Sequence, residues 1–231
     1  MRKSAWSLVL SMVLLLGVGF AGDTPEVKEE KDKISYSVGY QVGRDFKRQG
    51  VDLNPELLVR GVQDGMSGGK PLMTQQEMNE TLVDLKKKVV AEEQRQKKEA
   101  AGKNLQEGKA FLAENAKKKD VTTLPSGLQY KVIEKGSGAS PKKTDSVTVH
   151  YKGTLIDGTE FDSSYRRNEP ATFPLRGLIR AWQLAVPMMG IGDTIEIAAP
   201  ATLAYGPVGR GPIPGGATLL FRIELLDIPG Q

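Results

Sequence analysis

Hydrophobic residues in the first third of the chain recur at the spacing of an α-helix. The first run has an apolar residue at every fourth position: Ile34, Val38, Val42 and Phe46. Residues spaced in this way lie on one face of a helix, and Gly50 is typical of the position that follows a helix end. The pattern therefore predicts an amphipathic helix that stops near Gly50.

A second amphipathic helix is predicted directly afterwards. Asn54 and Pro55 are typical of an N-cap and a first helical position. The apolar stripe behind them consists of Leu58, Val62 and Met66. Because a core built from about 60 residues is marginal, we expect residues 22–73 to form a self-associating helical module. An independent small bundle is the alternative.

A third helix is predicted over residues 74–118. It begins with a capping-box pattern from Thr74 to Glu77, and no proline interrupts the chain before Pro125. Residues 92–104 contain no large apolar side chain, which is typical of a helix that crosses solvent. This segment is interpreted as a spacer between two bodies, with two helices joined by a kink as the alternative.

From Leu128 onward the apolar period changes from helical to two, which predicts strands separated by Gly-rich and Asp-Gly turns. The alternating positions are Leu128, Tyr130 and Val132; Val147, Val149 and Tyr151; Ile195 and Ile197; and Leu219, Phe221, Ile223 and Leu225. A short helical turn is predicted between residues 178 and 184. The chain is thus expected to be α+β, with an antiparallel sheet of about five strands in residues 124–231.

The first 21 residues have the pattern of a secretory signal peptide. Arg2 and Lys3 precede an apolar stretch, and Gly19 and Ala21 fit a cleavage site. A membrane anchor is the alternative, but the apolar stretch is shorter than the roughly 20 residues that a spanning helix needs. We therefore expect an exported, periplasmic protein without a stable membrane span, although outer-membrane association or secretion stays open.

Composition excludes several kinds of chemistry. The chain of 231 residues has no cysteine and one histidine, so disulfides, thiolate nucleophiles and multi-ligand Cys or His metal centres are excluded. No metal or cofactor is predicted. The net charge of +4 comes from interleaved acids and bases, which is not the one-signed patch expected of a nucleic-acid-binding protein.

The single histidine is not interpreted as catalytic. His150 alternates with Val149 and Tyr151 along a strand, so it points to the opposite face. No G-x-S-x-G elbow accompanies it, and the segment GPVGRGPIPGG lacks the lysine of a phosphate-binding loop. Most aromatic residues lie in the predicted sheet region, residues 124–231, where a group of them forms either an ordinary core or the walls of a cleft. This group consists of Tyr151, Phe161, Phe173, Trp182, Tyr205 and Phe221.

Several separated motifs in this half resemble the FKBP-type peptidyl-prolyl isomerases. They are VTVHYKGTLIDGTEFDSS, IRAW, LAYG and ATLLFRIELL, over roughly residues 124–229. Upstream, DKISYSVGYQVG, LLVRGVQDG and the long helix resemble the dimerisation module of the Mip and FkpA branch of that family. The resemblance implies a five-stranded antiparallel sheet wrapped around a short helix, with an apolar pocket that receives a proline ring and binds macrolide inhibitors.

The resemblance also implies the roles of individual residues. Tyr151, Asp162 and Tyr205 correspond to the catalytic positions, with Asp162 at the rim paired with Arg167. The Ile179 backbone N–H is implied to donate to a substrate carbonyl. The substrate-binding residues carried over by position are Phe161, Phe173, Leu178, Ile179, Trp182 as the pocket floor, Ile213 at the mouth, and Phe221.

Three residues depart from the family pattern: Ala171, Ala181 and Arg210. They bear on substrate preference and inhibitor affinity rather than on the fold. The function expected is a homodimeric prolyl isomerase that accelerates folding of proline-containing exported polypeptides. The alternatives are a dimeric chaperone in which isomerase activity is secondary, and a structural or adhesive protein that keeps the pocket as a relic.

Overall fold

The structure is a computed structural model that describes residues 26–230. The predicted signal peptide, residues 1–21, lies outside the described residues. The chain divides into two compact units between Lys70 and Pro71, which are described separately. No helix among residues 26–230 combines the length and the hydrophobicity needed to cross a membrane.

The N-terminal unit contains two helices, α1 (Glu30–Arg48) and α2 (Pro55–Ser67). Asn54 caps α2, because its Oδ1 accepts hydrogen bonds from the backbone N–H groups of Glu56 and Leu57 at 2.9 and 3.1 Å. Gly68 ends the helix with φ 67°, a conformation that glycine adopts without strain. The cap and first position predicted for this helix are confirmed.

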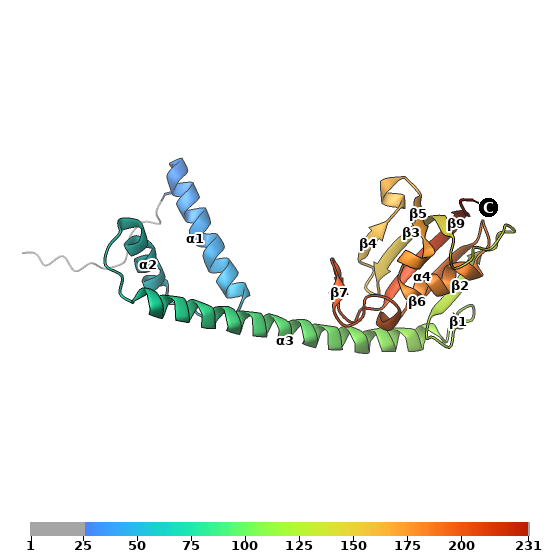
Figure 1. Cartoon of the computed structure of the whole chain (residues 1–231), viewed down its shortest axis with the longest axis horizontal. Coiled ribbons are helices and arrows are strands. Elements are labelled where there is room, and N and C mark those ends of the chain that lie inside the picture. Colours follow the sequence, from blue (N-terminus) through green and yellow to red (C-terminus); the bar gives the residue numbers. More distant parts are fainter. Residues whose placement is uncertain (1–25, 231) are drawn as a thin grey trace, which may run out of the picture. The chain divides into compact units, whose positions relative to one another are not determined.

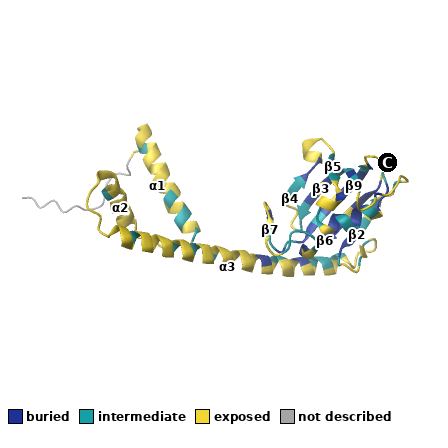
Figure 2. Ribbon diagram, viewed as in Figure 1, coloured by how far each residue is buried: buried dark blue, intermediate teal, exposed yellow. Residues whose placement is uncertain are grey.

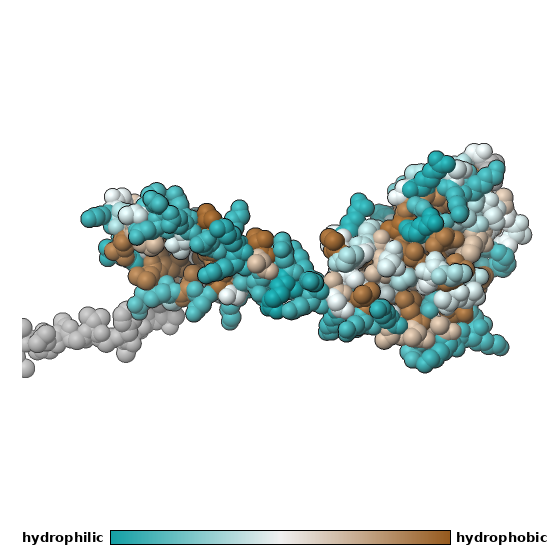
Figure 3. All heavy atoms as spheres, turned by 60° about the horizontal axis from the view of Figure 1, so that its bottom comes forward, coloured by the Kyte–Doolittle hydropathy of each residue, from teal (hydrophilic) through white to brown (hydrophobic). Residues whose placement is uncertain are grey.

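The apolar stripes of these two helices lie at the surface of the unit. No described residue of α1 or α2 is buried. Ile34 and Val38 of α1 are each 58% exposed, and Val62 of α2 is 54% exposed. Apolar side chains are correspondingly visible on this part of the molecule (Figure 3). Neither helix therefore builds a core of its own.

The second unit begins with α3 (Gln75–Asn115), a single helix of 41 residues. Its start is fixed by the predicted capping box: Thr74 Oγ1 accepts from the Glu77 N–H at 3.2 Å, and Glu77 Oε2 accepts from the Thr74 N–H at 2.8 Å. The helix ends at Asn115, three residues before the predicted limit of residue 118. It passes through both of its glycines without interruption, so the alternative of two helices was wrong.

Only part of α3 behaves as a spacer. Residues 93–100 are all exposed, whereas Ala101 and Gly108 are buried against the C-terminal domain (Figure 2). Asn104 Nδ2 donates to the Gly215 carbonyl at 2.8 Å. Gln129 Nε2 donates to the carbonyl of Leu112 at 2.8 Å. The last four turns of α3 are therefore part of the domain that follows them.

The domain is built on one antiparallel sheet with the order β1-β2-β6-β9-β3-β4, and β5 pairs with β3 beside β4 (Figure 1). A separate hairpin joins β7 to β8. The strands are β1 (Thr122–Thr123), β2 (Gln129–Glu134), β3 (Ser146–Leu155), β4 (Glu160–Ser163), β5 (Ala171–Pro174), β6 (Thr194–Ala199), β7 (Gly209–Arg210), β8 (Ile213–Pro214) and β9 (Leu219–Asp227).

The predicted α+β organisation is confirmed. The sheet has seven strands rather than about five, because β1 is a two-residue addition at one edge and β4 and β5 share the other edge. Short helical segments fill the connections: η1 (Tyr165–Arg167), η2 (Leu175–Gly177), α4 (Arg180–Ala185), η3 (Val186–Met188) and η4 (Ala201–Leu203).

The core lies between one face of the sheet and α4. Alternate residues of β3, β6 and β9 point to this face, as the period-two pattern predicts. Ala181, Trp182 and Ala185 of α4 are buried against them. The opposite face carries charged residues, among them Lys152, Glu196 and Arg222, so the sheet is apolar on one side and polar on the other.

Candidate active site

A cavity of about 450 Å³ opens among the sheet, the segment before α4, α4 itself and the β7–β8 hairpin. All ten predicted site residues line it: Tyr151, Phe161, Asp162, Phe173, Leu178, Ile179, Trp182, Tyr205, Ile213 and Phe221. They come from seven separate segments of the chain, so the fold brings together residues up to 70 positions apart (221 minus 151). Their catalytic and binding roles stay predictions.

Strand register fixes the walls of the cavity. Tyr151 follows Val149 at two-residue spacing on β3, so its side chain points to the core face. Phe221 of β9 is paired with Gly153 of β3, which leaves room for its ring beside that of Phe161. Trp182 rises from α4 and is 4% exposed. The indole therefore forms the base of the cavity, between the two strands.

The aromatic rings meet edge to face. The Trp182 ring centroid lies 5.5 Å from that of Tyr151, 5.6 Å from that of Phe221 and 6.3 Å from that of Phe173, with interplanar angles of 84° to 90°. Phe161 and Phe221 are 5.6 Å apart at 82°. Aromatic pairs favour this geometry. The rings brace one another and leave an apolar hollow.

Three polar groups form a closed cluster at the rim. The Tyr151 hydroxyl donates to Asp162 Oδ2 at 2.5 Å. Arg167 donates to Asp162 Oδ1 at 2.7 Å through Nη1 and to the Tyr151 hydroxyl oxygen at 3.0 Å through Nη2. The Arg167 guanidinium also lies 5.8 Å from the centroid of the Tyr151 ring. The carboxylate is thus neutralised and the phenol ring is held in one orientation.

The cluster shifts the pKa values of its members. Burial, and then the hydrogen bond to Asp162, raise the pKa of Tyr151 above its usual 10.0. Burial alone would raise the pKa of Asp162, but hydrogen bonds from Tyr151 and Arg167 outweigh it, and the pKa lies below the usual 3.8. At neutral pH Asp162 is therefore ionised and Tyr151 is a hydrogen-bond donor.

Two donors at the cavity have no acceptor within the described part of the protein. The Ile179 N–H precedes α4 and makes no hydrogen bond to residues 26–230, and neither does the Tyr205 hydroxyl. Both residues are partly exposed and line the cavity. They are available to a carbonyl group of a bound chain.

His150 does not line the cavity. Its Nδ1 lies 3.0 Å from Ser164 Oγ, and its ring stacks on that of Tyr165 at 4.7 Å. The interpretation of His150 as a packed strand residue is confirmed. Among residues 26–230 no cluster of three or more His, Cys, Asp or Glu residues is arranged to hold a metal ion.

The three departures from the family pattern fall in different places. Ala171 pairs with Val149 in the sheet, and Ala181 belongs to α4 and is fully buried. Arg210 does line the cavity, together with the neighbouring Gly211 and Pro212. Sequence analysis identified Arg210 as a departure from the family pattern that bears on substrate preference, but did not include it among the site residues. Its position between two predicted site residues, Tyr205 and Ile213, was the available signal.

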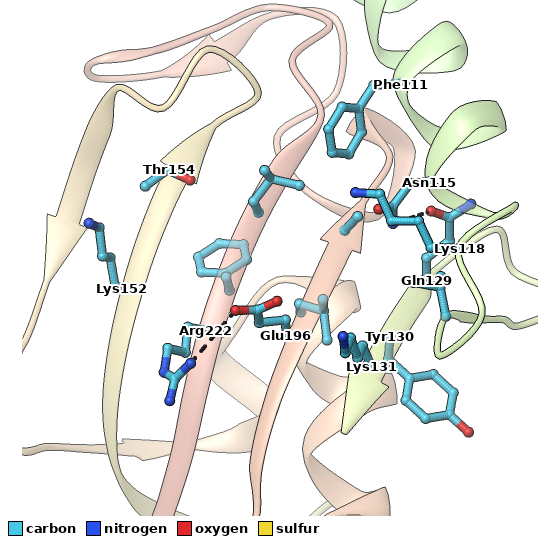
Figure 4. Close-up of a pocket in the computed structure, with 15 residues that line it drawn as sticks. Phe111, Asn115, Lys118, Gln129, Tyr130, Lys131, Lys152, Thr154, Glu196 and Arg222 are labelled. Atoms are coloured by element: carbon cyan, nitrogen blue, oxygen red, sulfur yellow. Dashed lines mark hydrogen bonds and ion pairs between the residues drawn. The ribbon is translucent and has the colours of Figure 1, made fainter. Parts of the chain in front are cut away.

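A second cavity, of about 500 Å³, lies on the polar face of the sheet beside the end of α3 (Figure 4). Its wall is mixed: it contains the aromatic residues Phe111, Tyr130 and Phe221, together with the charged residues Lys118, Lys131, Lys152, Glu196 and Arg222. Arg222 pairs with Glu196 at 3.7 Å, and Lys131 and Lys152 pair with acids outside the wall at 3.5 and 3.6 Å. No ring contact joins the three aromatic residues of this wall among residues 26–230, and five charged side chains line the same wall, so this cavity lacks the apolar hollow of the first.

Comparison with known proteins agrees with this geometry. Residues 31–132 match the family model described as the domain amino terminal to FKBP-type peptidyl-prolyl isomerase. Residues 138–226 match the model of the FKBP-type peptidyl-prolyl cis-trans isomerase itself. The two matches together cover most of the chain.

Individual relatives cover the same range. The outer membrane protein MIP of Legionella longbeachae is 45% identical over 210 residues, which is 90% of each chain. The peptidyl-prolyl cis-trans isomerase Mip of Coxiella burnetii is 42% identical over 220 residues, 95% of each chain. The crystal structure of FkpA from Escherichia coli matches with a TM-score of 0.73 and 37% identity, over 88% of this chain and 98% of that one. The chain therefore belongs to the FKBP-type peptidyl-prolyl cis-trans isomerases, in the branch that contains Mip and FkpA, and is an enzyme of that class.

Proposed function

We propose that the aromatic cavity is the site at which the enzyme catalyses cis–trans isomerisation of X-Pro peptide bonds in partly folded polypeptides. The observation that carries this proposal is the group of rings around Trp182, which leaves an apolar hollow next to two unpaired hydrogen-bond donors. An apolar hollow of this kind accepts the pyrrolidine ring. The donors, at Ile179 and Tyr205, then hold the backbone on either side of it.

No nucleophile is needed for this reaction. The barrier of roughly 18–20 kcal/mol reflects the loss of amide conjugation as the C–N bond twists. The twisted bond shares less charge between carbonyl and nitrogen than the planar bond does, so removal of water disfavours the planar state more. The hollow holds the pyrrolidine ring and the donors hold the backbone on either side of it while the C–N bond twists. Catalysis is thus assigned to binding of the twisted state.

The rim cluster has a positioning role in this mechanism. Asp162 and Arg167 hold the phenol ring of Tyr151 against Trp182 and Phe173. The neutralised carboxylate also keeps a free negative charge away from the carbonyl oxygen of the substrate. Tyr151 therefore forms a fixed wall, and Asp162 keeps that wall in place.

A prolyl isomerisation assay on the full chain tests the site. We expect Trp182→Leu to lower kcat/KM at least about tenfold, because it removes three edge-to-face contacts from the base of the cavity. Asp162→Ala should lower kcat/KM by a smaller factor, since the ring of Tyr151 stays but loses its restraint.

Matched controls separate the site from general damage to the domain. Tyr130→Leu removes an aromatic ring from the same sheet outside the cavity, and Asp120→Ala removes an exposed carboxylate that pairs with Lys131. Both controls should keep wild-type kcat/KM. Wild-type activity in Trp182→Leu and Asp162→Ala, with circular dichroism unchanged, would show that the cavity is not the site.

We further propose that the protein acts as a homodimer through residues 22–73. The support is the apolar surface of α1 and α2, on which Ile34, Val38 and Val62 are more than half exposed. A second copy would bury these side chains. The same exposed surface favours a second function, chaperone-like holding of unfolded chains, which would accompany the isomerase activity or outweigh it.

Export to the periplasm is also proposed. It rests on the signal-peptide pattern of residues 1–21, and a relative that is 45% identical carries the name of an outer membrane protein. Mass spectrometry of the protein produced in a Gram-negative host should find a chain that begins at Gly22 in the periplasmic fraction. Binding of macrolide inhibitors is proposed for the same cavity, and Trp182 fluorescence would report it.

A further inference from the structure

The cavity wall carries one positive charge that forms no ion pair with the described residues. Asp162 and Arg210 are the charged residues among those that line it. Asp162 is neutralised by Arg167 at 2.7 Å. Arg210 is exposed and forms no ion pair with any residue between 26 and 230. The mouth of the cavity is therefore positively charged.

The backbone holds Arg210 at this place. Arg210 belongs to β7 and is paired with Ile213 of β8, which is 7% exposed and lines the cavity. Gly209, directly before it, has φ 77°, and a Cβ atom there would collide with the carbonyl oxygen of Ile213. Glycine is thus required for the tight hairpin, and the hairpin fixes the Cα of Arg210 beside the cavity.

The guanidinium is also located by a ring contact. Its central carbon lies 5.9 Å from the centroid of the Tyr205 ring, within the range of a cation–π interaction. Tyr205 lines the cavity and has a free hydroxyl. A polypeptide that binds in the cavity and uses this hydroxyl therefore passes close to the charge of Arg210.

Two more arginines add to the positive electrostatic potential at this side of the cavity. Arg176 and Arg180 directly flank the wall segment Gly177–Ile179, and both are exposed. Within the described range neither forms an ion pair; Arg180 donates to Gln183 Oε1 at 3.3 Å instead. Among the residues that line the cavity, Asp162 is the one acid, and it is already paired with Arg167.

We propose that Arg210 is a specificity residue that selects prolyl substrates with a carboxylate side chain one or two positions from the proline. This inference rests on the proposed site. An exposed or partly exposed ion pair contributes a modest attraction, so the preference for an acidic over a neutral side chain should be about three- to fivefold in kcat/KM. The preference should fade at about 1 M salt, where the screening length falls to about 3 Å.

The test compares short peptides that differ in one side chain. Glu, Gln and Lys are placed immediately before the proline in one series and two residues before it in another, and cis–trans relaxation is followed without a protease. Glu and Gln are matched in shape and differ in charge. Wild type should favour Glu over Gln in at least one series, Arg210→Lys should keep the preference, Arg210→Gln should abolish it, and Arg210→Glu should favour Lys instead.

Arg166→Gln serves as the control, because it removes the same charge from an exposed arginine that is paired with Glu160 and does not line the cavity. Arg166→Gln should show the same ratio of kcat/KM for Glu and Gln peptides as wild type. Equal rates for Glu and Gln peptides in both series, or a Glu preference that survives Arg210→Gln, would overturn the assignment. Wild type that accelerates none of the peptides would instead contradict the proposed site.

Discussion

At the rim of the cavity, the carboxylate of Asp162 is engaged by other side chains of the protein. Asp162 accepts hydrogen bonds from both Tyr151 and Arg167, so its negative charge is compensated within the protein. Hydrogen bonds to the ionised form outweigh the cost of partial burial, and its pKa falls below 3.8. Asp162 therefore restrains the ring of Tyr151 wherever its carboxyl group is ionised.

This pKa has a consequence at low pH. Because the folded-state pKa of Asp162 is below its unfolded value, the contribution of the cluster is complete above about pH 4 and is lost as the pH falls through the folded pKa. We expect kcat/KM to stay constant down to about pH 4 and to decline below it. A protease-free fluorescence assay is suited to this range.

Asp162→Asn isolates the contribution of this residue. The variant should be about three- to tenfold less active near neutral pH, as expected for loss of charge-assisted hydrogen bonds at a partly exposed site, and it should lack the decline below pH 4. Asp193 has a lowered pKa as well, so unfolding must be measured for both proteins. If kcat/KM declines equally in wild type and Asp162→Asn below pH 4, the effect of acid comes from loss of folding stability and not from Asp162.

Residue roles at the cavity could be predicted only in part. Periodicity placed Tyr151 on the core face and His150 on the other, since alternation along a strand is a local property. The position of Asp162 beside Arg167 came from the family resemblance. The charge of Arg210 at the wall depends on the β7–β8 hairpin, whose two-residue strands carry no hydrophobic period.

At the scale of elements, the end of α3 is the part of the fold that sequence patterns missed. The contact with the domain uses Ala101 and Gly108, which are small, and the side-chain amides of Asn104 and Asn115. Small and amide side chains leave no apolar stripe, and the apolar pattern near the helix end consists of Phe111 and Leu112, both of which are partly buried. The start of the same helix was predictable, because the capping box of Thr74 and Glu77 is a local signal.

The two glycines of α3 give a matched test of this contact. A Cβ atom on Gly108 would collide with Thr218 Oγ1 and lie 3.1 Å from Thr218 Cβ, whereas a Cβ on Gly102 meets no described atom within 4 Å. Gly102→Ala should therefore stabilise the protein by up to about 1 kcal/mol through helix propensity. Gly108→Ala should destabilise it by about 1–3 kcal/mol through overpacking.

Urea unfolding followed by Trp182 fluorescence measures both variants. The buried indole reports the domain, so a lower midpoint in Gly108→Ala means that the helix and the domain unfold as one unit. Equal stabilisation by the two substitutions would mean that α3 does not pack on the domain at Gly108. The helix would then be a spacer along its whole length, as the residue pattern of its middle part indicates.

At the scale of the whole molecule, the N-terminal unit has apolar side chains without a core and the C-terminal unit has a core of its own. A chain that starts at Glu99 keeps Ala101, Gly108 and the contacts of α3 with the domain. It should fold and isomerise short peptides like the full chain. It should sediment as a monomer and lose the ability to suppress aggregation of an unfolded protein, because the exposed stripes are gone.

A pair of single substitutions on α1 separates dimerisation from the mere presence of the helices. Val38 is 58% exposed on the apolar stripe, and Ser37 is its exposed polar neighbour. Val38→Asp and Ser37→Asp add the same charge to the same turn, but only the first places it where a second copy would have to bury it. Sedimentation velocity should show a weakened dimer for Val38→Asp and wild-type assembly for Ser37→Asp. Equal behaviour of the two variants would exclude this stripe as the interface, and the self-association would then have to be sought in α2 or in the first turns of α3.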